Sequence, residues 1–339
     1  MSVQNHFAKY SSIENVNAKN IKTFRKLNYI NSDVEWIALE KIHGANFSYI
    51  TDGKNVTVAK RSSILLEDEN FYGHQDLLTK YYQDILIIFS KILEKDPTSK
   101  SVQVFGELFG GYFPGFNKFS KSIQKGVYYS PDINFLVFDI KVNTDLLSYF
   151  ISYDDMLEYL TETNLKSVPL ISRATFDVIV NLNPVFNSNV PKLYGLPDIE
   201  NNYAEGYVFK TNEQHSCNKP RPIIKSKNNA IFGEVDFVPK KHETSLTISD
   251  PVVNKYVSNI LPYITQNRFD GTIGKIGPDN PMGKICGMFV ADAVDDYEKE
   301  LHDDNINEFN KLKKKIKGIL CGYLMENQIH DLYNYHVKN

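Results

Sequence analysis

A lysine, a histidine and an asparagine lie close together in the segment Lys41-Ile-His43-Gly44-Ala-Asn46, between two stretches that are typical of β-strands. Glycine lets the backbone turn tightly or approach a ligand, so a turn at Gly44 can hold these side chains near one small volume. An unprotonated lysine amine is a nucleophile, and histidine and asparagine can hydrogen-bond to a substrate. The segment is therefore a candidate for nucleophilic chemistry, although an ordinary hairpin with exposed side chains would have the same composition.

Further charged side chains occur at or near the ends of other predicted strands. They are Arg61, Glu107, Asp139, Glu205, Lys210, Lys225 and Lys227. Side chains alternate along a strand with period two, so the two lysines of the predicted strand 223–227 share one face. Each of these residues, taken alone, is equally typical of a solvent-exposed strand end without a function. Together they supply several bases and three acids around one nucleophile, which favours a common site.

The elements that must position these residues are short strands rich in β-branched and aromatic residues. The predicted strands are residues 35–39, 46–50, 55–59, 102–106, 135–140 and 206–210. Helical periodicity predicts helices over residues 76–95 and 153–163. The first 240 residues therefore predict a domain of antiparallel β-sheets flanked by helices.

The pattern changes after Pro239 and becomes mainly helical. We expect a helix over residues 252–264 and two helices over residues 295–336, joined near Gly318–Gly322. The glycine-rich segment 270–292 predicts an exposed loop. The chain is thus expected to have an α+β fold with two domains, residues 1–240 and a smaller, mainly α-helical domain of residues 250–339.

Composition excludes several classes of protein. The chain has 339 residues, of which 42% are hydrophobic and 23% charged, and this is the balance of a globular protein. No apolar run approaches the roughly 20 residues needed to span a bilayer, so we expect no membrane partner. Three scattered cysteines and the lack of a secretory signal predict an intracellular, cytoplasmic protein. The chain has no phosphate-loop motif and no H-E-x-x-H or C-x-x-C pair, so a dedicated zinc site is not expected.

The K-x-H-G-x-N pattern resembles the nucleophile motif of the covalent nucleotidyltransferases, which comprise polynucleotide ligases and mRNA-capping enzymes. Those proteins carry K-x-D-G, whereas this chain has His43 in place of the acid and Asn46 in place of the usual arginine. This form is similar to that of the RNA ligase 2 family, which includes bacteriophage ligases of that type and the trypanosome RNA-editing ligases. The remaining motifs follow in family order between residues 35 and 230. The resemblance implies a nucleotidyltransferase (ATP-grasp-like) domain.

The resemblance also implies an activity, that of an ATP-dependent RNA ligase joining 3′-hydroxyl and 5′-phosphate ends, with nicked duplex RNA as its partner. Lys41 would attack the α-phosphorus of ATP, the AMP would move to the RNA 5′-phosphate, and the 3′-hydroxyl would displace it. The implied cofactors are ATP, whose AMP becomes covalently bound to Lys41, and Mg²⁺ or Mn²⁺. We expect a monomer in the cytoplasm, or in the host cytoplasm if the protein is viral.

Each motif residue has an expected role. Lys225 and Lys227 would neutralise charge on the α-phosphate, and Glu205 and Glu107 would hold the metal. Phe138 would stack on adenine, although a core aromatic residue is an open alternative, and Glu40 would either contact adenine or fix its strand. The catalytic set is Lys41, His43, Glu205, Lys225 and Lys227; the nucleotide-binding set is Glu40, Arg61, Glu107, Phe138, Val208, Lys225 and Lys227; the substrate-binding set is Asn46, Asp139 and Lys210.

Two other functions share this pattern. One is a DNA ligase or mRNA-capping guanylyltransferase of the same superfamily, and the other is an RNA-binding relative without catalysis. The net charge of -3 argues only weakly against nucleic acid, because a basic cluster at residues 311–317 follows an acidic run at residues 292–304. We expect the C-terminal domain to engage RNA through these lysines.

Overall fold

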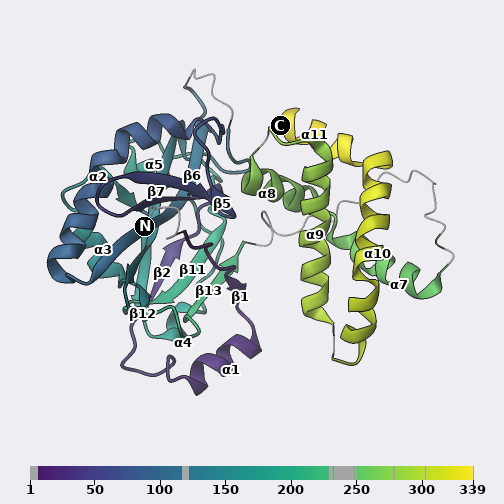
Figure 1. The fold of residues 1–339 in the computed structure, drawn as a ribbon, viewed down its shortest axis with the longest axis horizontal. Coiled ribbons are helices and arrows are strands. Elements are labelled where there is room, and N and C mark those ends of the chain that lie inside the picture. The colour runs from purple at the N-terminus through teal and green to yellow at the C-terminus, as the bar shows by residue number, and fades with distance from the viewer. Residues whose placement is uncertain are drawn as a thin grey trace. The chain divides into compact units, whose positions relative to one another are not determined.

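The computed structural model describes residues 7–116, 122–228, 250–277, 279–301 and 303–338, together with Phe232 and Ile248. The chain packs as two compact units, residues 1–231 and 232–339 (Figure 1). The first contains the β-sheets and the second is helical, which confirms the predicted α+β fold class. The predicted domain boundary, residues 240–250, lies almost entirely outside the described residues.

Within the described residues, the strands form two sheets. Sheet A has the order β1 (Glu14–Asn15), β13 (Ile223–Lys227), β11 (Gly206–Thr211), β2 (Trp36–Glu40) and β10 (Leu170–Ala174). Sheet B has the order β12 (His215–Ser216), β8 (Ser148–Phe150), β7 (Ser130–Thr144), β6 (Ser99–Tyr112), β3 (Ala45–Thr51), β4 (Val56–Lys60) and β5 (Ser63–Ile64), and β9 (Lys166–Ser167) pairs with β7. The helices of this unit are α1 (Ala18–Lys26), α2 (His74–Lys95), α3 (Tyr153–Leu160), α4 (Phe176–Ile179) and α5 (Val190–Leu193).

The two faces of sheet A carry different sets of side chains, because side chains alternate along its strands. On β11, Tyr207 and Phe209 pack into a hydrophobic cluster with Trp36 of β2 and Ile224 of β13. Residues one position away, such as Val208, therefore lie on the opposite face. That face is where the strands carry the predicted functional residues.

Sheet B is supported by α2, which lies along the outside of the unit (Figure 1). Its buried side chains include Leu77, Tyr81, Ile85, Ile88 and Ile92, at the three- and four-residue spacing of one helix face. This pattern predicted the helix to within two residues. Burying that face holds the long strands β6 and β7 in a fixed frame.

The helical unit consists of α7 (Pro251–Ile260), η2 (Leu261–Tyr263), α8 (Gln266–Ile276), α9 (Met282–Glu300), α10 (Asp303–Asn327) and α11 (Ile329–Lys338). The predicted loop over residues 270–292 is wrong, because most of this segment belongs to α8 and α9. Phe269, Ile273, Ile285 and Phe289 are fully buried at helical spacing. Their burial outweighs the cost of about 1 kcal/mol for each glycine in a helix.

The predicted joint near Gly318–Gly322 is also wrong, since α10 runs through both glycines without interruption. Among the described residues, no helix is both long enough and apolar enough to cross a membrane.

Replacing Gly287 by alanine should stabilise the helical unit. Gly287 lies within α9, and a Cβ added there would meet no atom within 4 Å. Alanine should therefore raise the free energy of unfolding by about 0.5–1 kcal/mol, measured by urea denaturation. The matched control is Gly277→Ala at the end of α8, where φ is +89°, and this change should destabilise by a similar amount. Equal effects at the two sites would contradict the helical assignment of α9.

Candidate active site

Lys41 lies directly after β2, in a row with two residues of the neighbouring strands. Its N–H donates to the Gly206 carbonyl at 2.9 Å, and Gly206 is in turn paired with Lys227 of β13. Residues opposite each other in paired strands point to the same face, so the two lysines flank the glycine. Gly206 has φ +138°, and a Cβ there would lie 2.1 Å from the Ser226 carbonyl oxygen. Only glycine therefore fits between the two lysines.

The Glu205 carboxylate lies at the centre of this arrangement. One oxygen, Oε2, is 2.5 Å from Lys41 Nζ and 3.6 Å from His43 Nδ1, and the other, Oε1, is 3.0 Å from Lys227 Nζ. Burial alone would raise the pKa of Glu205, but the two ammonium groups and His43 outweigh it and hold this pKa well below its usual range. Glu205 is thus a buried, ionised carboxylate that holds three predicted catalytic side chains.

Lys225 completes the cationic side of the site. Burial, reinforced by the charges of Lys41 and Lys227, lowers the pKa of Lys225 to about 8, against the opposing influence of Glu205 and Glu14. Lys225 and Lys227 share one face of β13, as the sequence predicted. The site therefore gathers three amines within range of one another's charge.

Glu107 is the second acid of the site, and it is placed on β6. Burial raises the pKa of Glu107 to about 8, and Glu205 adds to this effect while Lys41 and Arg61 oppose it. Asn46 of β3 is the residue paired with Glu107 across the sheet. The two acids thus differ in charge state, since Glu205 is ionised and Glu107 titrates near neutral pH.

Tyr129 supports the turn that contains His43, a role that no sequence motif indicates. Its hydroxyl accepts a hydrogen bond of 3.0 Å from the His43 backbone N–H, and its side chain is fully buried. Burial and the nearby carboxylates, Glu40 first among them, raise the pKa of Tyr129 well above its usual value. It is one of 21 tyrosines and belongs to no motif, so only the fold identifies it.

Glu40 points away from the three amines. Its carboxylate accepts a hydrogen bond of 2.5 Å from the Ser188 hydroxyl and one of 2.8 Å from the Asn189 N–H. Burial raises the pKa of Glu40 to about 7, although these hydrogen bonds oppose the shift. Of the two roles left open by the sequence, the geometry favours fixing the end of β2, directly before Lys41.

A β-bulge sets the direction of Phe138. Phe105 of β6 pairs with Asp139 while Gly106 pairs with Val137, so Phe138 is the extra residue in β7. Its ring lies 5.0 Å from that of Tyr10, centre to centre, and it is only partly buried. Val208 is likewise partly exposed on the functional face of β11. Both predicted adenine-binding residues therefore remain accessible.

Asp139 and Lys210, which were predicted to contact substrate, belong to a buried ion cluster. Lys210 Nζ is 2.6 Å from Asp139 Oδ1, and Arg221 binds both oxygens of the same carboxylate at 2.6 and 2.8 Å. Tyr10 donates a further short hydrogen bond to Asp139. Although burial opposes it, the two cations lower the pKa of Asp139 far below its usual value. The cluster ties β7 to β11, and a direct substrate contact stays a prediction.

The two acids of the site fit the predicted divalent metal. Among the described residues, no group of three or more His, Cys, Asp or Glu side chains is arranged to hold a metal ion. Glu107 and Glu205 are close enough for the charge of one to raise the pKa of the other. One or two carboxylates completed by water and phosphate oxygens are a usual magnesium environment.

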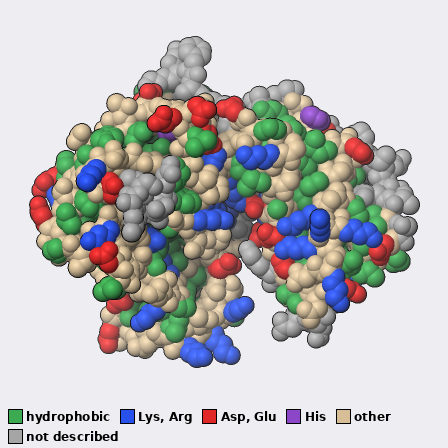
Figure 2. Space-filling view, in the orientation of Figure 1, with side chains coloured by type: hydrophobic (Ala, Val, Ile, Leu, Met, Phe, Trp, Pro, Cys, Tyr) green, Lys and Arg blue, Asp and Glu red, His purple; other side chains and the backbone are tan. Residues whose placement is uncertain are grey.

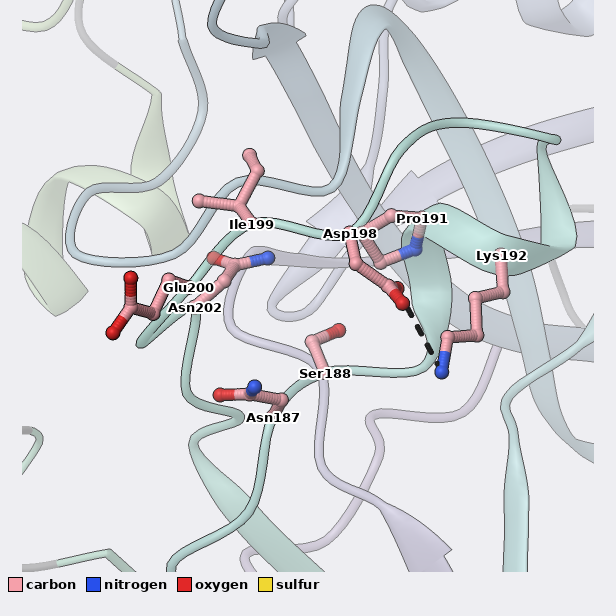
Figure 3. Close-up of a pocket in the computed structure, with 8 residues that line it drawn as sticks. All are labelled: Asn187, Ser188, Pro191, Lys192, Asp198, Ile199, Glu200 and Asn202. Carbon is pink, nitrogen blue, oxygen red and sulfur yellow. Dashed lines mark ion pairs between the residues drawn. The ribbon is translucent and has the colours of Figure 1, made fainter.

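A separate pocket of about 290 Å³ lies beside this site (Figure 3). Lys192 and Asp198 form an ion pair of 3.6 Å in its wall. None of the predicted site residues lines the pocket. One lining residue, Ser188, donates a hydrogen bond to the carboxylate of Glu40. The pocket is therefore not the nucleophile site.

The basic cluster of the helical unit is partly neutralised by acids. Lys313 lies 3.0 Å from Asp295, Lys317 lies 3.1 Å from the same acid, and Lys315 lies 3.0 Å from Asp250. Figure 2 shows basic and acidic side chains side by side on this unit. Within the part of the chain that the structure describes, no ion pair is formed by Lys311 or Lys314.

Two protein families match this sequence. The family described as RNA ligase matches residues 34–227, and the one described as T4 RNA ligase 2 C-terminal matches residues 249–325. The first match covers more than half of the chain and includes every predicted site residue. The second lies within the helical unit.

The chain is also similar to two mitochondrial RNA-editing ligases of Trypanosoma brucei brucei. It is 26% identical to RNA-editing ligase 2 of strain 927/4 GUTat10.1, over 89% of this chain and 85% of the relative. It is 29% identical to an RNA-editing ligase 1, over 88% of this chain and 77% of the relative. Among solved structures, the Naegleria gruberi RNA ligase with PPi has a TM-score of 0.42 and 16% identity, over 66% of this chain and 56% of that one. The chain thus spans little more than half of that structure's length.

Replacing Glu40 by glutamine should change how stability depends on pH. The folded protein keeps the Glu40 proton up to about pH 7, whereas the unfolded chain releases it near the ordinary pKa of 4.5. The wild type therefore loses roughly 3 kcal/mol from this group as the pH rises through that window, and the amide loses none.

Glutamine can keep both contacts, because its oxygen accepts from the Asn189 N–H and its amino group donates to the Ser188 hydroxyl. Urea unfolding at pH 5 and pH 8 should show that the free energy of unfolding of the variant increases relative to that of the wild type as pH rises. A constant difference between the two proteins would contradict the raised pKa of Glu40.

Proposed function

Because the chain belongs to the RNA ligase family, we propose that it seals breaks in RNA through a covalent AMP adduct on Lys41. The enzyme is an ATP-dependent RNA ligase, and its β-rich unit is the nucleotidyltransferase domain. The observation that carries the proposal is the grouping of Lys41, Lys225 and Lys227 around the ionised carboxylate of Glu205. This grouping provides a nucleophile together with the cations that a phosphate needs.

The first step is the attack of the Lys41 amine on the α-phosphorus of ATP, with diphosphate as the leaving group. Attack requires the neutral amine, so Lys41, whose side chain is 22% exposed, must release a proton to water and leave its 2.5 Å ion pair with Glu205. Lys225 and Lys227 stabilise the negative charge that builds on the α-phosphate. Glu205 and Glu107 would hold a divalent cation through their ionised carboxylates, and this cation would supply Lewis-acid stabilisation of the same charge.

The nucleotide is held by residues on both sheets. Phe138 stacks on one face of adenine and Val208 closes the other, since both side chains are partly exposed. Arg61 binds a ribose hydroxyl or a phosphate through its planar guanidinium. Glu107 contacts the ribose, whose hydroxyl groups can donate hydrogen bonds to its carboxylate.

The second and third steps use the RNA ends. AMP moves from Lys41 to the 5′-phosphate, and the 3′-hydroxyl of the other end then displaces AMP and closes the backbone. His43 and Asn46 contact these ends, because both lie beside the nucleophile and carry hydrogen-bond donors. The substrate is nicked duplex RNA, and the enzyme acts as a monomer. The trypanosome relatives are mitochondrial by name, and the cytoplasmic location of this chain stays a prediction.

Labelling of the protein tests the first step. Incubation with α-labelled ATP and Mg²⁺ should attach label to the polypeptide through a P–N bond, which acid cleaves and alkali leaves intact. Lys41→Ala should abolish the label, because the nucleophile is lost. The matched control is Lys9→Ala, a surface lysine of the same unit, which should label like the wild type. Labelling of the Lys41 variant would refute the proposal, and labelling by GTP instead of ATP would favour a capping enzyme.

Binding of RNA tests the role of the helical unit. The double variant Lys311→Ala, Lys314→Ala should bind nicked duplex RNA more weakly and lower the slope of log affinity against log salt by about 2, as expected for two lost phosphate contacts. Its self-labelling should be unchanged. The control Lys315→Ala, Lys317→Ala removes two ion-paired lysines and should alter the slope less. Equal slopes for both pairs would place the RNA elsewhere, and preferred sealing of nicked DNA would identify a DNA ligase.

A further inference from the structure

The N-terminal segment 7–16, here called the N-terminal strap, joins the two sheets of the β-rich unit. At one end, the Ala8 N–H donates to Gln103 Oε1 of β6 at 2.9 Å, and Gln103 Nε2 donates to the Ala8 carbonyl at 3.1 Å. Tyr10 then packs on Phe138 and binds Asp139. These contacts fix the first half of the strap to sheet B.

The other end of the strap belongs to sheet A. Glu14 and Asn15 form β1, which runs parallel to β13 with Asn15 opposite Lys225 (Figure 1). The Val16 N–H donates to the Lys225 carbonyl at 3.0 Å. The strap is therefore fixed at both ends, and its second end lies directly against one of the site lysines.

Ser12 lies between these two anchors and contacts Arg61. Arg61 Nη2 donates to the Ser12 hydroxyl at 2.8 Å; Ser12 is exposed and Arg61 is half-buried. Arg61 directly follows β4, whose last residue, Lys60, pairs with Phe47 of β3, so Arg61 lies next to the strand end that carries Asn46. Its charge also lowers the pKa of Glu107. A long side chain on a turn loses much conformational entropy when it binds a ligand, and a partner that holds it beforehand reduces that cost.

We propose that Ser12 is a positioning residue, which holds the Arg61 guanidinium in place to bind ATP. Because the strap is anchored on β6 and on β13, the Ser12 hydroxyl stands at a fixed point relative to both sheets. The strap thereby supplies one side of the nucleotide site from a segment that precedes every predicted motif. This inference rests on the proposed function, in which the nucleotide is ATP and Arg61 contacts it.

The test is ATP binding, measured by calorimetry with Mg²⁺ in a Lys41→Ala background, where no covalent adduct can form. Ser12→Ala should weaken ATP binding about 5- to 10-fold, the size expected for the net contribution of one exposed hydrogen bond. Ser12→Thr keeps the hydroxyl and should stay within about 2-fold of the parent. The matched control is Ser11→Ala, because Ser11 is equally exposed and makes no hydrogen bond within the described residues.

A double-mutant cycle separates positioning from a structural role. In an Arg61→Ala background, Ser12→Ala should cause no further loss of ATP affinity, because its effect acts through the guanidinium. The inference would be overturned if Ser12→Ala caused the same loss of ATP affinity with and without Arg61. It would also be overturned if Ser12→Ala left ATP binding unchanged, or if a lowered melting temperature accounted for the loss of affinity. If the wild type with Lys41 showed no self-labelling, the covalent mechanism would be refuted, but this binding test would be unaffected. If no ATP binding were detected at all, both the mechanism and this inference would be overturned.

Discussion

The geometry of the site depends on one buried carboxylate, that of Glu205, which lies between Lys41 and Lys227. A buried charge is costly unless it is paired, so Glu205 needs both ammonium groups, and each of them is held by it in turn. The pairing requires that β2, β11 and β13 be adjacent in sheet A. It also requires a residue without a side chain between the lysines, and this fixes glycine at position 206.

A second buried carboxylate, Asp139, shows how the same interaction can serve a structural purpose. Its partners are Lys210, Arg221 and Tyr10, and Lys210 is almost fully buried, with 4% of its surface exposed. Around Glu205, by contrast, Lys41 and Lys227 keep 22% and 32% of their side-chain surface exposed. Both clusters neutralise a buried acid, but the cations around Glu205 are more exposed than Lys210 and Arg221, which keep 5% and 17% of their side-chain surface exposed. This difference in exposure distinguishes the functional cluster around Glu205 from the structural cluster around Asp139.

The sequence allowed prediction of those features that depend on local pattern. Period-two alternation correctly placed Lys225 and Lys227 on one face, and apolar spacing predicted α2. Features set by tertiary contacts could not be predicted in this way. The bulge that directs Phe138, the Tyr129 hydroxyl under His43 and the Ser12–Arg61 bond each join segments that are distant in sequence or depend on strand register. Glycine content was misleading in the C-terminal part, because buried apolar side chains decide between helix and loop more strongly than propensity does.

In both units, the charge that a ligand meets depends on which charged side chains are paired with each other, and not on the net charge of the sequence. The lysines of α10 form a dense cluster in the sequence, yet Lys313, Lys315 and Lys317 have acids within 3.1 Å. An ion pair on the surface contributes little to stability, but it lowers the positive potential that a phosphate backbone encounters. In the β-rich unit the opposite holds, since Glu205 is the one ionised acid that contacts Lys41 and Lys227, and burial raises the pKa of Glu107 to about 8. A chain with a net charge of -3 can therefore present a strongly cationic site for a triphosphate.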